Sequence, residues 1–243
     1  MKVIPVLDIL GRQAVHAVRG RRNEYHPMRS VLCESARPLD IARAFRKFGF
    51  EELYVADLDA ILGKSSNVGL LRRIKAETDL SIMVDAGVSD LRSAERLFKS
   101  GISEVILGSE TLRRLDFVGD AITRFGEDRV IVSLDLIRGR VVARSESISS
   151  MNPLMFATML EEMGVRKIIV LDLQNVGSRE GVELQVPKQI LRKLDMKVIT
   201  GGGVRHIRDL KKLKEIGVSG ALVATVLHTG ILGRTELRSA GFL

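Results

Sequence analysis

One stretch of the sequence, residues 84–109, reads VDAGVSDLRSAERLFKSGISEVILGS, and it returns in altered form at residues 200–225 as TGGGVRHIRDLKKLKEIGVSGALVAT. Each copy holds an apolar run, a glycine-containing turn, an amphipathic segment and a second apolar run. This order is typical of a strand–helix–strand unit with parallel strands. The two copies predict a chain made of two similar halves.

The apolar runs of these copies belong to a larger alternation along the whole chain. Eight runs occur, at residues 3–7, 52–56, 81–85, 104–108, 130–134, 167–171, 197–200 and 220–224. They are rich in Val and Ile and lack strict alternation, which is typical of parallel strands covered on both faces. Eight such units in 243 residues predict an α/β protein folded as a (β/α)₈ TIM barrel, with an open doubly wound sheet as the alternative.

The segments between the runs have the spacing of amphipathic helices. In the segment 38–48, Leu39, Ala42 and Phe45 share one face, and Ser89 is predicted to cap a later helix. Four of these segments are followed by a glycine, the residue that commonly ends a helix in the left-handed conformation: Gly49, Gly101, Gly164 and Gly217.

The internal repeat extends beyond the first pair of segments. IPVLDILGRQAV at 4–15 is similar to IVSLDLIRGRVV at 131–142, and YVADL at 54–58 is similar to IVLDL at 169–173. We therefore expect one barrel over residues 1–243, with half-barrels at about 1–126 and 127–243.

The basic composition allows more than one interpretation. The net charge is +8 and the pI is about 9.9, but the basic residues are spread along the predicted helices and the chain has no Trp and two Tyr. Scattered charges usually form a solvated surface, and an anionic substrate attracted by the net charge is an alternative. Nucleic-acid binding, which requires a dense basic stripe or stacking aromatics, is not expected.

Other features bear on location and cofactors. No run of 18 apolar residues occurs, so no membrane association is expected, and the first apolar segment is interpreted as a strand rather than a signal peptide. Cys33 is the single cysteine and the four histidines are scattered, so we expect neither a metal nor a cofactor. A cytoplasmic enzyme is the expectation, and the sequence gives no indication of oligomeric state.

Two aspartates end matching strands of the two halves. Asp8 ends the first predicted strand and Asp135 ends the fifth, so the repeat places them on opposite sides of the same rim. Two carboxylates that face a small bound molecule are suited to paired acid and base catalysis, provided that one holds a proton near neutral pH. The alternative is that each binds loop amides.

A second set of polar residues also follows strand ends. Asp57 and Asp172 are a matched pair for which we expect chiefly a role in fixing loops, with substrate contact as the alternative. The remaining candidates for substrate contact in these predicted rim loops are His16, Asn67, Gly177 and Ser178, each with a purely structural role as the alternative.

The glycine run Gly201–Gly203 follows the seventh strand and predicts a phosphate site. Glycines let backbone N–H groups approach an anion closely. In eight-stranded barrels this loop binds phosphate together with the loop after the eighth strand, here Ala224 and Thr225, so Gly202 and Gly203 are the predicted partners.

The matching site in the first half consists of Gly87, Gly108 and Ser109. It is predicted to share the backbone geometry of the glycine run. However, Asp85 stands where a phosphate would lie, and it is therefore a candidate substrate contact.

These motifs resemble the HisA/HisF barrels of histidine biosynthesis, and the HisA branch most closely. The resemblance covers nearly the whole chain and rests on PVLDI, VADLDA, SLDLIRGRV, DLQNVGS and GGGV. It implies an Amadori rearrangement of the bisphosphorylated aminoaldose ProFAR (phosphoribosylformimino-5-aminoimidazole carboxamide ribotide) to an aminoketose. It also implies that Asp8 and Asp135 are the acid–base pair and that both symmetric sites bind phosphate.

The sequence departs from the HisA pattern at three places. The usual GGGIR after the third strand is replaced by DAGVS at 85–89, and Leu171 stands where the T-D-I-x-x-D-G pattern has its threonine. That pattern's second aspartate is also missing, and the V-G-R of the eighth strand is VAT at 223–225. In these respects the chain is similar to HisA-related paralogues of archaea and methylotrophs.

Three functions follow from the resemblance. The first is an Amadori-type isomerase of a phosphorylated ribosyl-amine substrate. The second is a HisA paralogue of methanopterin cofactor biosynthesis with a different phosphorylated substrate, and the third is a non-catalytic barrel that binds phosphometabolites. Because Asp85 occupies the second phosphate site, we expect weak ProFAR turnover and a ligand with one phosphate, unless Asp85 points away or pairs with an arginine.

Overall fold

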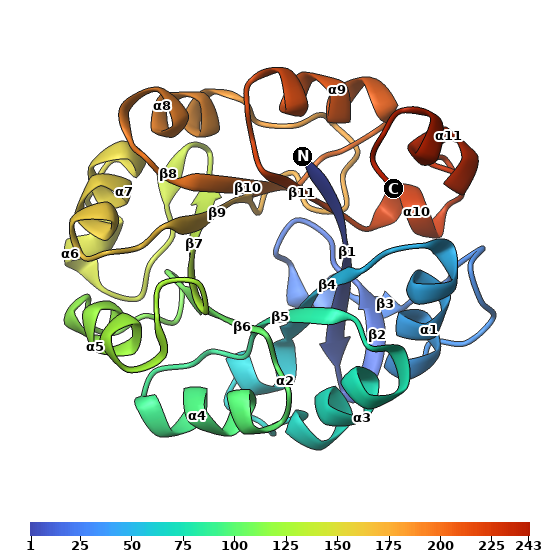
Figure 1. Cartoon of the computed structure of the whole chain (residues 1–243), viewed down its shortest axis with the longest axis horizontal. Coiled ribbons are helices and arrows are strands. Elements are labelled where there is room, and N and C mark those ends of the chain that lie inside the picture. The colour runs from blue at the N-terminus through green and yellow to red at the C-terminus, as the bar shows by residue number, and fades with distance from the viewer.

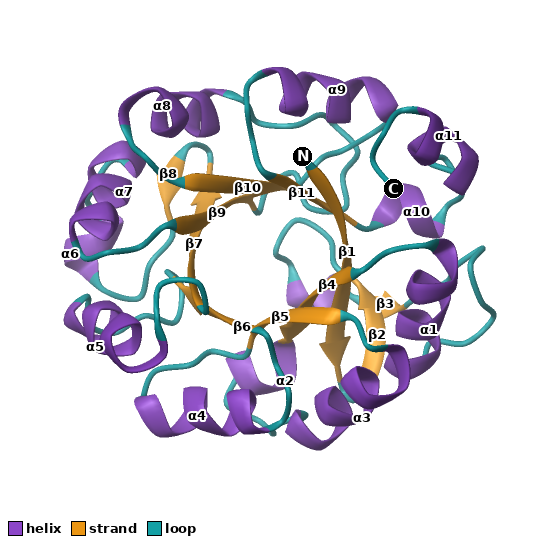
Figure 2. Ribbon diagram, viewed as in Figure 1, coloured by secondary structure: helices purple, strands orange, loops and turns teal.

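The structure is a computed structural model that describes all residues, 1–243. Eight parallel strands form a closed barrel: β1 (Lys2–Leu10), β4 (Glu52–Asp57), β5 (Ser81–Asp85), β6 (Glu104–Gly108), β7 (Val130–Ile137), β9 (Lys167–Asp172), β10 (Lys197–Gly201) and β11 (Gly220–Val223). Each strand pairs with the next, and β11 pairs with β1, so the sheet has no free edge (Figures 1 and 2). The closure confirms the predicted TIM barrel and excludes the open sheet.

Three short strands lie outside the barrel wall. β2 (Gln13–His16) pairs antiparallel with the end of β1 and carries β3 (His26–Pro27), while β8 (Arg140–Val141) pairs antiparallel with β7. β2 therefore extends the sheet beside Asp8, which lies between Val15 of β2 and Ala56 of β4.

Helices surround the barrel as an outer ring (Figure 2). They are α1 (Pro38–Phe48), α2 (Leu58–Ile61), α3 (Val68–Thr78), α4 (Leu91–Lys99), α5 (Asp116–Phe125), α6 (Glu146–Ser149), α7 (Pro153–Glu162), α8 (Gln185–Lys193), α9 (Ile207–Glu215), α10 (Thr225–His228) and α11 (Arg234–Ser239), with a 3₁₀ turn at Arg22–Glu24. None of them combines the length and apolar character that a membrane-spanning helix needs.

The strands are apolar on both faces because each face meets a separate core. One core lies between the strands and the helices, and the other fills the barrel interior. Every strand of the barrel wall contributes to the interior core, and β4 contributes twice: Ile4, Tyr54, Ala56, Met83, Ile106, Ile131, Ile169, Ile199 and Leu222. This double burial accounts for the lack of strict alternation in the apolar runs.

The helix ends follow the sequence predictions with one exception. Gly49, Gly101, Gly164 and Gly217 all have positive φ angles, between 92° and 117°, as predicted for helix-ending glycines. The predicted Ser89 cap is wrong: the carboxylate of Asp90 accepts the amide N–H of Ser93 at 2.8 Å and caps α4.

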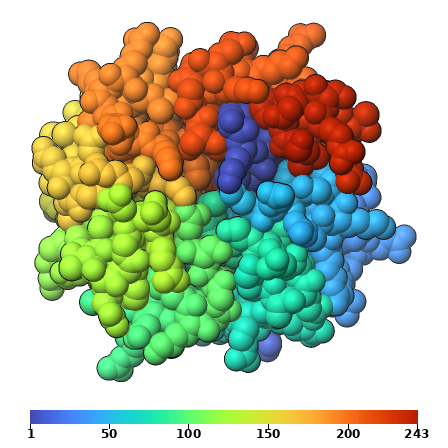
Figure 3. All heavy atoms as spheres, viewed as in Figure 1, coloured from blue at the N-terminus to red at the C-terminus, as the bar shows by residue number.

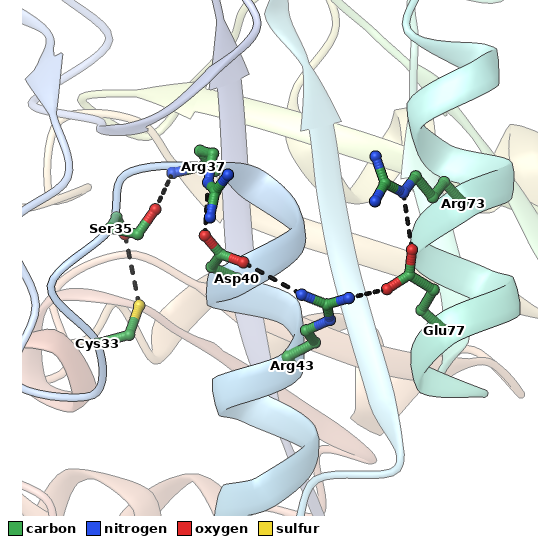
Figure 4. Close-up of polar contacts among 7 residues, drawn as sticks. All are labelled: Cys33, Ser35, Arg37, Asp40, Arg43, Arg73 and Glu77. Carbon is green, nitrogen blue, oxygen red and sulfur yellow. Dashed lines mark hydrogen bonds and ion pairs between the residues drawn. The ribbon is translucent and has the colours of Figure 1, made fainter.

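The surface between α1 and α3 carries a chain of ion pairs (Figure 4). Asp40 accepts from Arg37 at 2.7 Å and from Arg43 at 3.4 Å, and Arg43 continues the chain to Glu77, which also pairs with Arg73. Exposed pairs of this kind each contribute about 1 kcal/mol or less. They join two neighbouring helices on the outside of the barrel.

The two ends of the barrel differ in what they expose. The start of β1, dark blue in Figure 3, lies on the face shown there beside the red and orange segments of the second half. Because all eight barrel strands run in parallel, their carboxyl ends, including Asp8 and Asp135, gather at the opposite end.

Candidate functional site

A cavity of about 260 Å³ opens at the carboxyl ends of the barrel strands. Asp8 of β1, Asp85 of β5 and Asp135 of β7 line it together with Leu171 of β9. Glycines of the loop after β10 complete the wall on the far side from Asp85. In TIM barrels this end carries the active site.

Asp8 has a carboxylate that accepts no hydrogen bond from the protein. Nothing therefore offsets the cost of burying its charge, and burial raises the pKa of Asp8 to about 7. The alternative role for Asp8, binding of loop amides, is therefore not seen in the structure.

Asp135 sits in a more polar environment and is 4% exposed. Its carboxylate accepts the Ser133 hydroxyl at 2.7 Å, and its backbone amide donates to the Ser109 hydroxyl oxygen at 3.1 Å. Burial raises the pKa of Asp135 to about 8, the Ser133 hydroxyl opposes this rise, and the nearby charge of Asp85 adds to it.

The two carboxyl groups are therefore poised to exchange protons near neutral pH. Asp135, with the higher pKa, is the more protonated of the two at pH 7 and can donate a proton, whereas Asp8 is the more readily ionised and can accept one. A pair of titrating groups in one cavity with pKa values that differ is the arrangement that acid–base catalysis requires.

The rim after β10 and β11 offers a set of free backbone donors. The amide N–H groups of Gly202, Gly203, Ala224 and Thr225 make no hydrogen bond within the protein, and all four residues line the cavity. Free amides that converge on a cavity form an anion-binding site. Their placement matches the predicted phosphate site.

The glycines at this rim are required by close packing. Gly202 and Gly203 have φ angles of +98° and +82°, and a Cβ on Gly203 would lie 1.9 Å from the carbonyl oxygen of Gly181. Only glycine can take this conformation at this distance without strain. The packing holds the backbone in the position that leaves the amides free.

His16 lies beside this rim and reaches it from β2. Its Nε2 is 3.0 Å from the Thr225 hydroxyl, and the residue lines the cavity, as expected for a substrate contact. Burial, and then the positive charge of Arg179, lower the pKa of His16. The ring is therefore neutral at pH 7 and can fix the orientation of Thr225.

The matching rim after β5 and β6 differs from the prediction. The Gly87 amide donates to the Asp85 carboxylate at 3.0 Å, the Ser109 amide donates to the Ser133 carbonyl, and the Ser109 hydroxyl donates to the Val142 carbonyl. Gly87 and Ser109 therefore have no free donor for a phosphate. The sequence shows their positions but not that neighbouring groups already use their hydrogen bonds.

Gly108 lies between two of the carboxylates. A Cβ at this position would be 2.9 Å from Asp85 Oδ2 and 3.7 Å from Asp135 Oδ2. The glycine thus leaves room for the acidic side chains. Asp85 is 6% exposed, and burial raises its pKa to about 7 while the Gly87 amide lowers it.

Asp57 and Asn67 form a network outside the cavity. Asp57 accepts the Asn67 side-chain amide at 2.7 Å and its backbone amide at 3.0 Å, and Asn67 also donates to Asp59. Asp59 in turn accepts the amides of Gly11 and Arg12. These contacts fix the loop after β4 to the loop after β1. Asp57 and Asn67 therefore have the structural role that was the alternative to substrate contact.

The candidates after β9 have separate positions. Asp172 accepts the Gln174 amide at 3.1 Å and the Asn175 side chain at 2.6 Å, and Ser178 donates to the Asn175 carbonyl. Neither Asp172 nor Ser178 lines the cavity, but Gly177 does. A Cβ on Gly177 would lie 2.3 Å from the carbonyl oxygen of Ala17, which follows β2, so this glycine permits the two loops to meet.

Several cavity residues are absent from the sequence predictions. They are Arg19, Arg22, Tyr25, Tyr54, Glu110 and Arg179. Tyr54 could have been found, because it occupies an inward position of β4 among apolar residues. The others lie in rim loops, where no periodic pattern shows direction. Arg22 forms an ion pair with Glu110, and Arg19 forms one with Glu180.

Comparison with known proteins gives relatives over the full length of the chain. An uncharacterized protein of Methanocaldococcus jannaschii is 31% identical over 98% of this chain and 97% of its own length. Proteins of Streptococcus sanguinis and Streptococcus thermophilus, both named 1-(5-phosphoribosyl)-5-((5-phosphoribosylamino)methylideneamino) imidazole-4-carboxamide isomerase, are 30% and 31% identical over 99% of this chain and 98% and 100% of their lengths.

The sequence also matches a protein family as a whole. Residues 2–233 match the family described as histidine biosynthesis protein, a range that includes every strand of the barrel and both rims of the cavity. The HisA-type resemblance is thereby confirmed at the level of the family. The chain belongs to the histidine biosynthesis protein family of (β/α)₈ barrels.

Proposed function

We propose that this protein is an Amadori-type aldose–ketose isomerase that acts on a phosphorylated ribosyl-amine substrate. The observation that carries the proposal is the pair Asp8 and Asp135, which line one cavity from the first and fifth barrel strands and have pKa values of about 7 and 8. The names of the streptococcal relatives agree with this reaction class.

The chemistry assigns each aspartate one role. Protonated Asp135 donates a proton to the ring oxygen of the aminoaldose, and the ring opens to a protonated imine. Ionised Asp8 removes the proton from C2, which gives an enaminol. A proton returned to C1 and loss of the enol proton yield the aminoketose, so the reaction is an isomerisation with no net change in atoms or electrons.

The substrate's phosphate is proposed to bind the free amides of Gly202, Gly203, Ala224 and Thr225. Backbone N–H groups are well suited to phosphate oxygens, and the Thr225 hydroxyl beside His16 supplies a further donor. This end of the cavity thus orients the sugar, and the aspartates act on its C1–C2 end.

A second candidate function is supported by the rim after β5 and β6, opposite the free amides. Asp85 and the apolar Leu171 line the cavity where the HisA pattern has glycine and threonine. An acid about 4 Å from a phosphate opposes it by roughly 4 kcal/mol per unit charge at an effective dielectric of 20. A HisA paralogue of methanopterin biosynthesis, with a substrate other than ProFAR, would account for this rim.

The non-catalytic alternative is disfavoured, because binding alone does not require two carboxyl groups in one cavity whose pKa values are raised to about 7 and about 8. A single barrel over 1–243 built from half-barrels at about 1–126 and 127–243, a cytoplasmic location, and action without metal or cofactor remain part of the proposal.

The proposal is tested with N-linked 5-phosphoribosylamines that carry one phosphate. The purified protein is incubated with a set of such compounds, and the aminoketose is detected by chromatography and by the ¹³C shift of its new ketone carbon. We expect conversion of at least one of them. Failure to convert any of them or ProFAR, by a protein that binds phosphate, would leave the non-catalytic barrel as the better description.

A further inference from the structure

The carboxylate of Asp85 has an unused hydrogen-bond acceptor at the wall of the cavity. Asp85 is 6% exposed, and its Oδ1 accepts the Gly87 amide at 3.0 Å. Its Oδ2 accepts no hydrogen bond from the protein, and the residue lines the cavity. A carboxylate oxygen that faces a cavity and accepts no hydrogen bond from the protein is free to accept one from a ligand.

Residue 108 is a glycine, which lets Asp85 Oδ2 lie close to the backbone at this position. Asp85 Oδ2 and Asp135 Oδ2 both lie within 3.7 Å of the position that a Gly108 Cβ would take. Two carboxyl oxygens of residues that line the cavity therefore lie close to the same point. A group in the cavity that has several N–H donors can donate to both oxygens, whereas an anion would be repelled by the ionised carboxylate of Asp85.

Glu110 adds a further acid to this rim and is held by Arg22. The rim thus has three carboxyl groups, Asp85, Glu110 and Asp135, against one guanidinium. The opposite rim, at Gly202 and Thr225, has free amide donors, and the loops after β10 and β11 place no acidic residue in the cavity lining. The cavity is therefore polarised, with an anion-binding end and an end that accepts hydrogen bonds.

We propose that the Asp85 end of the cavity binds a cationic, N–H-donating group of the substrate, such as an ammonium or amidinium, while the substrate's only phosphate binds at the opposite rim. The proposal rests on the proposed function for the phosphate at the Gly202 end, and it specifies the chemical class of the rest of the substrate.

Two further observations support it. The pKa of Asp85 is raised to about 7 chiefly by burial, which is the behaviour of a carboxyl group whose partner is missing. In addition, Asp85 itself takes the Gly87 amide that an anion would otherwise use. A competing arrangement is that Arg22 leaves Glu110 and binds a second phosphate, and this is one outcome of the test.

The test uses linear phosphates that differ only at the far end. Alkyl phosphates, ω-aminoalkyl phosphates and alkyl bisphosphates of increasing chain length are titrated into the purified protein by calorimetry at pH 8. At the length that spans the cavity, the aminoalkyl phosphate should bind roughly 10- to 100-fold more tightly than the alkyl phosphate, the gain expected for a charge-assisted hydrogen bond. The bisphosphate should bind more weakly than the aminoalkyl phosphate.

The Asp85→Asn variant identifies the group responsible. Asn retains a carbonyl that can accept the Gly87 amide, so the loop should keep its conformation, and circular dichroism checks the fold. The variant should lose the preference for the amino end while its affinity for alkyl phosphate is unchanged. Asp128→Asn, an exposed residue at the opposite end of the barrel, makes the same change in net charge and should retain the preference.

The outcomes separate this proposal from the proposed function. Equal affinity for amino and methyl ends, including no measurable binding of either, overturns the cationic site. Tighter binding of the bisphosphate overturns it in favour of Arg22, and Glu110→Gln should then strengthen that binding further. The isomerase proposal is instead decided by conversion of phosphoribosylamines, which none of these probes measures.

Discussion

The carboxylate of Asp85 accepts a hydrogen bond from the backbone amide of Gly87 at 3.0 Å. This amide is therefore not free to bind a phosphate at the rim where the resemblance to HisA predicts one. The opposite rim has no such internal anion, and the amides of Gly202 and Gly203 stay free. The cavity therefore has one end suited to phosphate and one that is not, and this asymmetry underlies the predictions.

The free amides predict the location of a bound anion. In crystals soaked in phosphate or sulfate, we expect density at Gly202, Gly203 and Thr225 and none at Gly87 and Ser109. The reason is that only the first set has unused donors. Density at Gly87, with none at Gly202, Gly203 and Thr225, would show that the phosphate-binding end of the cavity is the opposite one.

The acid–base pair predicts the effect of removing either carboxyl group. Asp8→Asn and Asp135→Asn should each lower kcat by about 10²- to 10⁴-fold, the usual contribution of a positioned acid or base. The unfolding temperature should be unchanged or slightly raised, because a carboxyl group in a desolvated cavity is replaced by a neutral amide. An asparagine variant with near-normal kcat would remove that residue from the mechanism, and Asp128→Asn controls for the change in net charge.

The pKa values predict a narrow pH optimum. The base Asp8 must be ionised, so kcat/KM should rise as pH increases through about 7, and the acid Asp135 must be protonated, so it should fall as pH increases through about 8. Because the site also contains Asp85, the two limbs report the coupled group rather than single residues. A rate profile that is flat through the neutral range would contradict these roles.

His228 predicts a pH dependence of stability outside the cavity. The ring is 3% exposed, its Nδ1 contacts Ser30, its Nε2 has no partner, and burial lowers its pKa to about 4 from 6.5. Between these values the unfolded chain binds a proton that the folded chain excludes. Stability due to the neutral ring is thus present above pH 6.5 and falls as pH is lowered toward 4, by about 2–3 kcal/mol.

This contribution is isolated by comparison with His228→Gln, which cannot titrate. The difference in unfolding free energy between wild type and variant, measured by urea denaturation, should shrink as pH falls from 6.5 to 4. His26→Gln, at an exposed histidine, is the control. A difference that stays constant over this range would show that His228 is not buried in its neutral form.

The fold was predictable from sequence because its signals are local and repeated. The apolar runs marked every barrel strand, and the positions of Asp8 and Asp135 at strand ends were enough to bring them to one rim. The glycine run likewise marked the rim whose backbone amides are free, because such a run at a strand–helix junction indicates close approach to the backbone.

The details of the other rim were not predictable, because they depend on loop conformation. Nothing in the sequence shows that Asp85 turns back to the amide two residues later, or that Arg22 meets Glu110 from a distant loop. The same holds for the helix cap, where Ser89 and Asp90 are both good capping residues and backbone geometry selects Asp90. Asp57 and Asn67 were ambiguous until their mutual hydrogen bonds were known.

The most direct test of the central claim, that this cavity accepts one phosphate, is the rate of ProFAR isomerisation by the purified protein. We predict a kcat/KM well below about 10⁴ M⁻¹s⁻¹, the lower end of the usual enzyme range, and no rescue of a strain that lacks HisA. Asp85→Gly should raise this rate, because it removes the internal anion from the Gly87 amide. A wild-type kcat/KM of about 10⁴ M⁻¹s⁻¹ or more would contradict the claim and make ProFAR the substrate.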